Sequence, residues 1–193
     1  MAKTRLLVVG AGGHGRSVAE AAVLSDQFEV VGFLDDGLPR GTSVLNAVVL
    51  GSIASMSQHL AGTDQVIVAI GNNALRERLT QQVTEVGFKF ATVVHPRAIV
   101  SPSASLGAGS VVMAGAIVGT EASLGIGTIV NCGAVVDHQA KVEAYGHLGV
   151  NASMAGGTVL GRNAWMQAGT AIGFGICVSP GSILQPGVSV MKQ

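Results

Sequence analysis

The chain has 193 residues with 11 basic and 11 acidic side chains, so its formal net charge is zero. Nucleic acid and anionic membrane surfaces both attract a basic excess, and this balance therefore argues against either as the main partner. Only 11% of the residues are charged and 28 are glycine, which favours an oligomer that hides faces or an architecture with small residues at its corners.

The first 92 residues alternate between strand and helix patterns. Strands are expected at 6–9, 28–34 and 66–70, and helices at 17–24 and in the stretch after Asn73. This alternation predicts a parallel sheet with crossover helices. The segment is too short for two mononucleotide-binding halves, so residues 1–92 are expected to form a Rossmann-like domain of roughly half the usual size.

A glycine-rich loop, Gly-Ala-Gly-Gly-His-Gly at residues 10–15, follows the first predicted strand and opens a helix. Glycines at such a place let backbone amides approach a diphosphate at the positive end of the helix. Asp35 and Asp36 stand about 20 residues further on, where an NAD enzyme holds its ribose. The small domain and the unusual His14 favour a nucleotide diphosphate here. A dehydrogenase and a purely structural turn are the alternatives.

From residue 94 onward, every sixth residue is aliphatic or methionine. These positions are Val94, Val100, Leu106, Val112, Val118, Leu124, Val130, Val136, Val142, Leu148, Met154, Leu160, Met166, Ile172, Val178, Leu184 and Val190. The residue four places after each is mostly Ala, Ser, Thr or Gly, with Ile176 and Val188 as exceptions. A period of six predicts a parallel β-helix with the large residue pointing inward. Residues 93–193 are therefore expected to form about five triangular coils.

Residues 98–120 carry no charge and are long enough for a membrane span. Serines and a proline interrupt them and the six-residue period continues through them, so a soluble repeat is expected. No apolar leader with a cleavage site is visible, and Cys132 and Cys177 have neither metal nor redox spacing. The sequence therefore predicts a cytoplasmic protein with free thiols and no membrane contact.

Among the histidines, His138 interrupts the repeat at a turn, where side chains face outward. A solvent-facing imidazole can act as a general base near neutral pH, and acyl transfer to an amine or hydroxyl needs one. The alternative is a solvated surface histidine. His95 is expected to be structural and His59 to lie on the surface. Because His138 and His147 are half a coil apart and zinc needs three convergent ligands, no metal is expected.

Over nearly its whole length the chain resembles the sugar acetyltransferases of bacterial surface-glycan synthesis. These include N-acetyltransferases of nucleotide-linked amino-deoxy sugars and sialic acid O-acetyltransferases. The residues that carry the resemblance are 10–15, 33–36, 69–73 with Arg76, 93–96, and Asn131 followed by Asp137 and His138. The resemblance implies a left-handed winding and a cytoplasmic, homotrimeric, acetyl-CoA-dependent enzyme of polysaccharide biosynthesis. Its acceptor would be a sugar amine. The alternatives are O-acetylation of a sialic acid type of sugar, or a non-catalytic nucleotide-sugar-binding trimer.

The resemblance also implies roles for individual residues. The nucleotide sugar would contact Gly12, Gly13, His14, Asp35, Asp36, Gly71, Asn72 and Asn73. His138 falls on the family's catalytic base, with Gln139 beside it. Acetyl-CoA would be held by His147, Ala155, Gly156 and Ala168, in a cleft between neighbouring β-helices.

The chain departs from this family at two places. Many members carry Glu where this chain has Gln139, and an amide orients an imidazole without stabilising imidazolium by charge. Asp137 or Glu143 could compensate, and Gln139→Glu is expected to raise activity modestly unless another group already polarises the imidazole. The family's Gly-x-Pro-Ala-basic tail, which helps cover the cofactor, is absent from residues 191–193.

Overall fold

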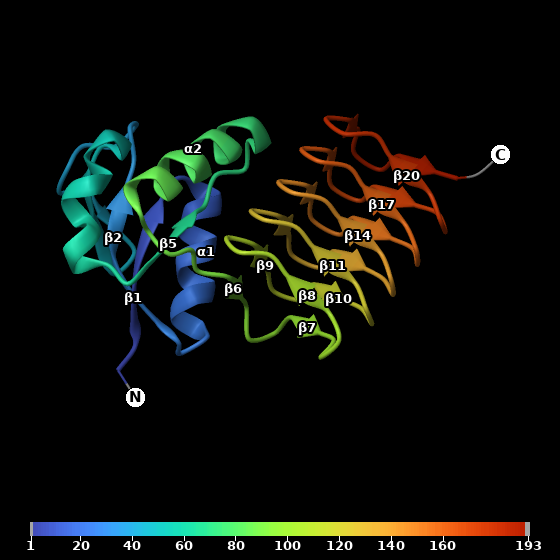
Figure 1. The fold of residues 1–193 in the computed structure, drawn as a ribbon, viewed down its shortest axis with the longest axis horizontal. Helices are drawn as coiled ribbons and strands as arrows, with labels where there is room; N and C mark the ends of the chain where they lie inside the picture. The colour runs from blue at the N-terminus through green and yellow to red at the C-terminus, as the bar shows by residue number, and fades with distance from the viewer. Residues whose placement is uncertain (1, 192–193) are drawn as a thin grey trace. The chain divides into compact units, whose positions relative to one another are not determined.

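A computed structural model of the protein describes residues 2–191. The chain divides after Val93 into two compact units, Met1–Val93 and Val94–Gln193. The first unit alternates strands with helices, and the second repeats one short strand at each six-residue step (Figure 1). Among residues 2–191, no helix is both long enough and apolar enough to cross a membrane. Lys192 and Gln193, which stand where the family's tail was compared above, lie outside the described residues.

Within residues 2–93, the first unit contains one five-stranded sheet with the order β3-β4-β2-β1-β5. Its strands are β1 (Thr4–Val9), β2 (Phe28–Leu34), β3 (Ser43–Val44), β4 (Ala47–Gly51) and β5 (Gln65–Val68), and its helices are α1 (Gly13–Leu24), the 3-10 helix η1 (Ile53–Gly62) and α2 (Asn73–Val86). β1 pairs in parallel with β2 and β5, and β2 with β4. The predicted parallel sheet is thus confirmed, with one antiparallel pair, β3 and β4, at its edge.

The middle of this sheet is buried on both faces. Leu6, Leu7, Val8 and Val9 of β1 are all fully buried. Successive residues of a strand point to opposite faces, so both faces of β1 are covered, as expected for a central parallel strand. Because β1, β2 and β5 run parallel, their carboxyl ends meet at one edge of this buried sheet.

Two features of the first unit differ from the prediction. Residues 43–62 form the β3–β4 hairpin and η1, where no element was expected, and Val44 and Val49 of the hairpin are buried. Helix α1 begins at Gly13, before the expected start at Ser17. The N–H of Arg16 already bonds to the carbonyl of Gly12, so the helix grows directly from the glycine loop.

Within residues 93–190, seventeen two-residue strands form three sheets, here called the first, second and third walls. The first wall contains β6 (Val93–Val94), β9 (Val111–Val112), β12 (Ile129–Val130), β15 (His147–Leu148), β18 (Trp165–Met166) and β21 (Ile183–Leu184). The second wall contains β7 (Ile99–Val100), β10 (Ile117–Val118), β13 (Val135–Val136), β16 (Ser153–Met154), β19 (Ala171–Ile172) and β22 (Ser189–Val190). The third wall contains β8 (Ser105–Leu106), β11 (Ser123–Leu124), β14 (Lys141–Val142), β17 (Val159–Leu160) and β20 (Cys177–Val178).

Each of these strands pairs in parallel with the strand one coil away, as Val136 does with Met154. One coil is therefore 18 residues, or three hexads. The three walls form the predicted left-handed parallel β-helix.

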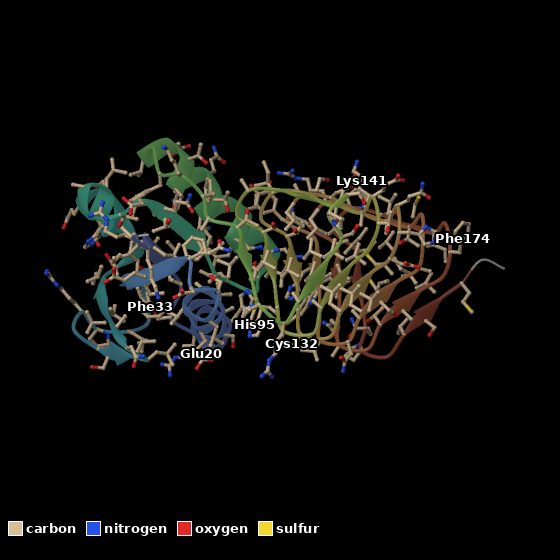
Figure 2. The ribbon with its side chains drawn as sticks, turned by 90° about the horizontal axis from the view of Figure 1, so that it is seen from below. Glu20, Phe33, His95, Cys132, Lys141 and Phe174 are labelled. Atoms are coloured by element: carbon tan, nitrogen blue, oxygen red, sulfur yellow. The ribbon has the colours of Figure 1, made fainter. Side chains whose placement is uncertain are left out.

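The predicted inward residues fill the interior of the β-helix. Of the seventeen hexad positions, the twelve from Val112 to Val178 are buried. The remaining five are half-buried, namely Val94, Val100, Leu106, Leu184 and Val190. These five belong to the end coils, which have a neighbouring coil on one side only. Alternate residues point outward, and Lys141, whose neighbour Val142 is buried, lies on the outer surface (Figure 2).

The corners between the walls explain the high glycine content. Fourteen described residues of the second unit have positive φ, and nine of them are glycine. Glycine adopts this backbone conformation without the steric cost that other residues bear. Two of the exceptions, Glu121 (φ 58°) and Gln139 (φ 57°), lie at the corner between the second and third walls.

Candidate active site

The glycine loop borders a hollow of about 280 Å³ in the first unit. The lining residues are Gly10, Gly12, Gly13, His14, Gly15, Asp35, Ala69, Ile70 and Gly71. They follow the carboxyl ends of β1, β2 and β5, and the N-terminus of α1 stands among them. Open α/β sheets bind ligands at this edge, and a helix N-terminus attracts anions. The hollow therefore has the position and polarity of a phosphate-binding site.

The loop glycines are of two kinds. A Cβ atom on Gly15 would overlap the carbonyl oxygen of Gly10, so the absence of a side chain there allows α1 to pack on the end of β1. Gly10 has φ +104° and would place a Cβ atom 2.9 Å from the carbonyl oxygen of Ala69. By contrast, Gly12 and Gly13 have no atom within 4 Å of the position of a Cβ. Packing requires Gly10 and Gly15, whereas Gly12 and Gly13 leave open space beside the helix N-terminus.

His14 lies in the first turn of α1, and its Nε2 atom is buried without a hydrogen-bond partner among the described residues. Burial, and after it the positive charge of Arg76, lower the pKa of His14 to about 4. The imidazole is therefore neutral near pH 7. A buried polar atom without a partner is costly, so Nε2 is a candidate contact for a ligand in the hollow.

Arg76 is a buried charge beside this loop that the sequence analysis did not single out as a site residue. It is only 1% exposed. Its guanidinium donates to the carbonyls of Ile70 (2.9 Å) and Gly71 (3.2 Å) and to the side-chain oxygen of Asn73 (3.0 Å). These bonds hold a fixed positive charge behind residues that line the hollow. Two signals point to it: its place among the residues that carry the family resemblance, and a charge on the otherwise mostly apolar buried face of α2.

The acidic pair after β2 binds backbone amides. Asp35 accepts the N–H groups of Ala11 (2.7 Å) and Gly37 (2.8 Å), so it fixes the shape of the glycine loop. Asp36 accepts the N–H of Ile53 (2.8 Å), at the start of η1. Of this predicted pair, Asp35 lines the hollow, and Asp36 is not among the lining residues.

After β5, too, one predicted site residue lines the hollow and the others do not. Asn72 caps α2 by accepting the N–H of Leu75 (2.9 Å), and Asn73 accepts from Arg76. Gly71 lines the hollow, whereas neither asparagine is among its lining residues. The structure thus brings together Gly12, Gly13, His14, Asp35 and Gly71, and places Asp36, Asn72 and Asn73 beside them. The residues outside the lining are Asp36, Asn72 and Asn73. Each accepts a hydrogen bond with its side-chain oxygen, from a backbone N–H or from Arg76.

In the second unit, His138 lies at the corner between β13 and β14 with a side chain that is 51% exposed. Its backbone N–H donates to Oδ1 of Asp137 (2.7 Å), and its Nε2 lies 3.9 Å from Oδ2 of the same carboxylate. Gly156 stands one coil further on. A Cβ atom there would overlap the imidazole at Cε1 and Nε2. The ring therefore lies against a glycine and is half exposed to solvent.

Gln139 is oriented away from the imidazole. Its backbone is in the left-handed region, and its side-chain amide donates to Oε2 of Glu121 (3.0 Å), one coil earlier. Its backbone N–H donates to the carbonyl of Thr120 (2.8 Å). The side chain predicted to orient His138 thus binds a carboxylate of the neighbouring turn.

The residues predicted to hold acetyl-CoA lie at three places on the β-helix. His147 is on β15 of the first wall, is 6% exposed, and stacks on Trp165 with ring centres 5.3 Å apart. Ala155 and Gly156 share the corner of His138, between the second and third walls, and Ala168 lies between the first and second walls. A single β-helix therefore separates His147 from His138.

The other singled-out residues have simple environments. His95 accepts the N–H of Arg97 at its Nδ1 (3.0 Å), in line with a structural role, and His59 is half-buried on η1. Cys132 and Cys177 are free thiols. Across residues 2–191, no three His, Cys, Asp or Glu side chains are grouped as metal ligands.

A second, larger hollow of about 600 Å³ in the first unit contains none of the predicted site residues. Its lining is mostly apolar and comes from α1, β2 and the β3–β4 hairpin, with the charged residues Lys3, Glu20 and Glu29. It has no glycine loop or helix N-terminus, so the smaller hollow is the better candidate for binding an anion.

A family model and several known proteins match the chain. Residues 5–83 match the family model of the PglD N-terminal domain. A curated relative, the UDP-N-acetylbacillosamine N-acetyltransferase of Bacillus subtilis (strain 168), is 33% identical over 117 residues. That match covers 55% of this chain and 50% of the relative, so the chain aligns with half of that protein's length.

Two solved structures match almost the whole chain. The acetyltransferase domain of PglB from Neisseria gonorrhoeae, in complex with acetyl coenzyme A, is 34% identical with a TM-score of 0.81, over 99% of this chain and 97% of that one. PerB from Caulobacter crescentus, in complex with CoA and GDP-perosamine, is 31% identical with a TM-score of 0.85, over 98% of this chain and 94% of that one.

Proposed function

We propose a function for this chain, which belongs to the family of sugar N-acetyltransferases that includes the acetyltransferase domain of PglB and PerB. The proposed activity is transfer of the acetyl group of acetyl-CoA to the amine of a nucleotide-linked amino-deoxy sugar. The observation that carries this proposal is the likeness to the acetyl-CoA-bound PglB domain, at 34% identity over 99% of the chain.

The first unit would anchor the nucleotide sugar through its diphosphate. The N-terminus of α1, the open space beside Gly12 and Gly13, and the fixed charge of Arg76 all favour an anion in the hollow. His14 stays neutral at pH 7, so one ring nitrogen can donate and the other can accept a hydrogen bond. Such an anchor recognises the nucleotide half of the acceptor and takes no part in the chemistry.

The second unit would carry out the acyl transfer. The acceptor nitrogen attacks the thioester carbonyl and forms the new C–N bond, while His138 takes a proton from that nitrogen. A backbone amide stabilises the oxyanion of the tetrahedral intermediate. This intermediate collapses by breaking the C–S bond, and the departing thiolate of CoA takes the proton from the imidazolium. The products are an N-acetyl sugar and CoA, and His138 returns to its neutral form.

The assembly is proposed to be a homotrimer. His138 and His147 lie on different sides of one β-helix, so an acetyl-CoA molecule that contacts both must bind between two copies. Ala155, Gly156 and Ala168 would line that cleft with small side chains. A cytoplasmic location and a place in polysaccharide biosynthesis belong to the same proposal, because nucleotide sugars and acetyl-CoA are cytoplasmic substrates.

The test is release of CoA thiol from acetyl-CoA in the presence of UDP- and GDP-linked sugars. Each amino sugar is compared with the matching sugar that has a hydroxyl in place of the amine. We expect thiol release with at least one amino sugar and little with its hydroxyl counterpart. Preference for the hydroxyl acceptor would make the protein an O-acetyltransferase. Tight nucleotide-sugar binding without thiol release would indicate a non-catalytic binding protein.

A further inference from the structure

Three carboxylates lie on or beside the corner that carries His138, and each already has partners. Glu143 accepts the backbone N–H of Arg162 (3.0 Å) with one oxygen and lies 3.6 Å from Nζ of Lys141 with the other. Glu121 accepts the side-chain amide of Gln139 (3.0 Å). Glu143 and Glu121 are thus directed toward groups other than the imidazole.

Asp137 is the carboxylate that accompanies the imidazole. One of its oxygens accepts the backbone N–H of His138 (2.7 Å), which fixes the carboxylate relative to the backbone of that residue. Its other oxygen lies 3.9 Å from Nε2 of the ring. Gly156 is a second neighbour of this part of the ring, because a Cβ atom on that glycine would overlap Cε1 and Nε2. The Nε2 side of the ring therefore has a carboxylate and a glycine of the next coil as neighbours.

We propose that Asp137 is the positioning residue for His138, and that Glu121 keeps Gln139 out of this role. The proposal rests on the acyl transfer proposed above. When His138 takes the proton from the acceptor nitrogen it becomes an imidazolium, and the negative charge of Asp137 stabilises it until the proton passes to the thiolate of CoA. Asp137 itself neither gains nor loses a proton.

This arrangement reverses one expectation from the sequence. A carboxylate introduced by Gln139→Glu would face Glu121, whose oxygen now lies 3.0 Å from the amide nitrogen. Two carboxylates at that separation repel each other, and both residues have φ values near 60° that restrict where their side chains can move. Gln139→Glu alone is therefore expected to give no gain in activity.

The first experiment replaces Asp137 by Asn, which keeps an oxygen for the N–H of His138 and removes the charge. We expect kcat to fall about 3- to 10-fold with unchanged KM for both substrates, since a half-exposed charge pair is worth little. Glu143→Gln is the matched control and should leave kcat unchanged. In a His138→Ala background, Asp137→Asn should cause no further loss. An unchanged kcat, or an equal loss in both backgrounds, would overturn the proposal.

The second experiment tests Glu121 and Gln139 as a pair. Gln139→Glu should not exceed the wild type, whereas Glu121→Gln combined with Gln139→Glu should be faster than Gln139→Glu alone, because the exchange restores one amide and one carboxylate. A gain in kcat from Gln139→Glu by itself would show that Glu121 does not control residue 139.

A third measurement does not depend on activity. NMR relaxation of the His138 ring should show a more mobile imidazole in Asp137→Asn and an unchanged one in Glu143→Gln, because only the first variant changes the side chain that lies beside Nε2. Equal ring mobility in Asp137→Asn and the wild type would contradict the positioning role. If the wild type transfers no acetyl group to any acceptor, the proposed function fails, and the relaxation measurement still decides whether Asp137 positions His138.

Discussion

At the scale of single residues, the glycine loop separates packing from binding. Gly15 has no room for a side chain, whereas Gly13 borders open space in the hollow. Gly13→Ala should keep the thermal stability of the wild type and weaken nucleotide-sugar binding at least about tenfold, because the new methyl group occupies space beside the helix N-terminus.

The matched control is Gly15→Ala, in which the methyl group meets the carbonyl oxygen of Gly10. This change should destabilise the protein by about 1 to 3 kcal/mol, the usual cost of overpacking. Differential scanning calorimetry and isothermal titration with the nucleotide sugar distinguish the two effects. Full affinity in Gly13→Ala would exclude the hollow as the diphosphate site.

His14 makes stability depend on pH. Its pKa of about 4 in the folded protein is below the ordinary value of 6.5, so protons bind preferentially to the unfolded chain. The free energy of unfolding keeps its full value with respect to His14 above about pH 6.5. As the pH falls toward 4, the unfolded chain takes up the proton and this free energy drops by up to about 3 kcal/mol. Thermal unfolding of the wild type and His14→Gln between pH 4 and 7.5 tests this. The wild type should lose more stability in acid, and parallel curves would contradict the burial of a neutral imidazole.

At the scale of one element, each hexad contributes one inward residue to a continuous core. Val142 is fully buried on β14, and its neighbour Lys141 points outward and is exposed. Val142→Asp should destabilise the protein by several kcal/mol, because an unpaired carboxylate would be buried among aliphatic side chains. Lys141→Asp changes only an exposed ion pair, which is worth less than about 1 kcal/mol. Chemical denaturation should show this contrast, and similar losses in both variants would argue against the inward assignment of residue 142.

Periodicity made the second unit predictable. Every coil repeats the same geometry, so the position of Val136 in its hexad already determined its burial, and Val94 and Leu184 differ only because they lie in end coils. The same period pairs residues 18 apart, so it also contained the contact of Gln139 with Glu121. Both residues lie at a corner, where no apolar pattern indicates which side chains interact, so the period alone does not predict this hydrogen bond.

The first unit was predictable only in part. β1 and β2 were predicted from apolar runs, whereas the run at 47–50 carried no expectation and forms β4, which pairs with β2 and β3. A short apolar run does not by itself distinguish a strand from a buried helix segment. The roles of Asp35 and Asp36 also depend on tertiary structure, since their carboxylates bind backbone amides of segments distant in sequence. Residue type and spacing located the loop, and only the fold distinguished residues that line the hollow from residues that shape it.

At the scale of the whole molecule, the proposed trimer shares each active site between two copies. His138→Ala and His147→Ala trimers should each be nearly inactive. Trimers reassembled from a mixture of the two should regain activity, because some clefts then combine an intact His138 with an intact His147. Mass spectrometry of the intact assemblies confirms mixing. Mixed trimers as inactive as their parents would contradict the shared site.

His138 is proposed to be the base for acetyl transfer to a nucleotide-linked amino sugar. This role is tested by kcat of the wild type and His138→Ala with the best acceptor, together with nucleotide-sugar affinity by calorimetry. We expect His138→Ala to lower kcat by about 10²- to 10⁴-fold, the usual contribution of a general base, and to leave the affinity unchanged. Turnover near that of the wild type in His138→Ala would contradict this role.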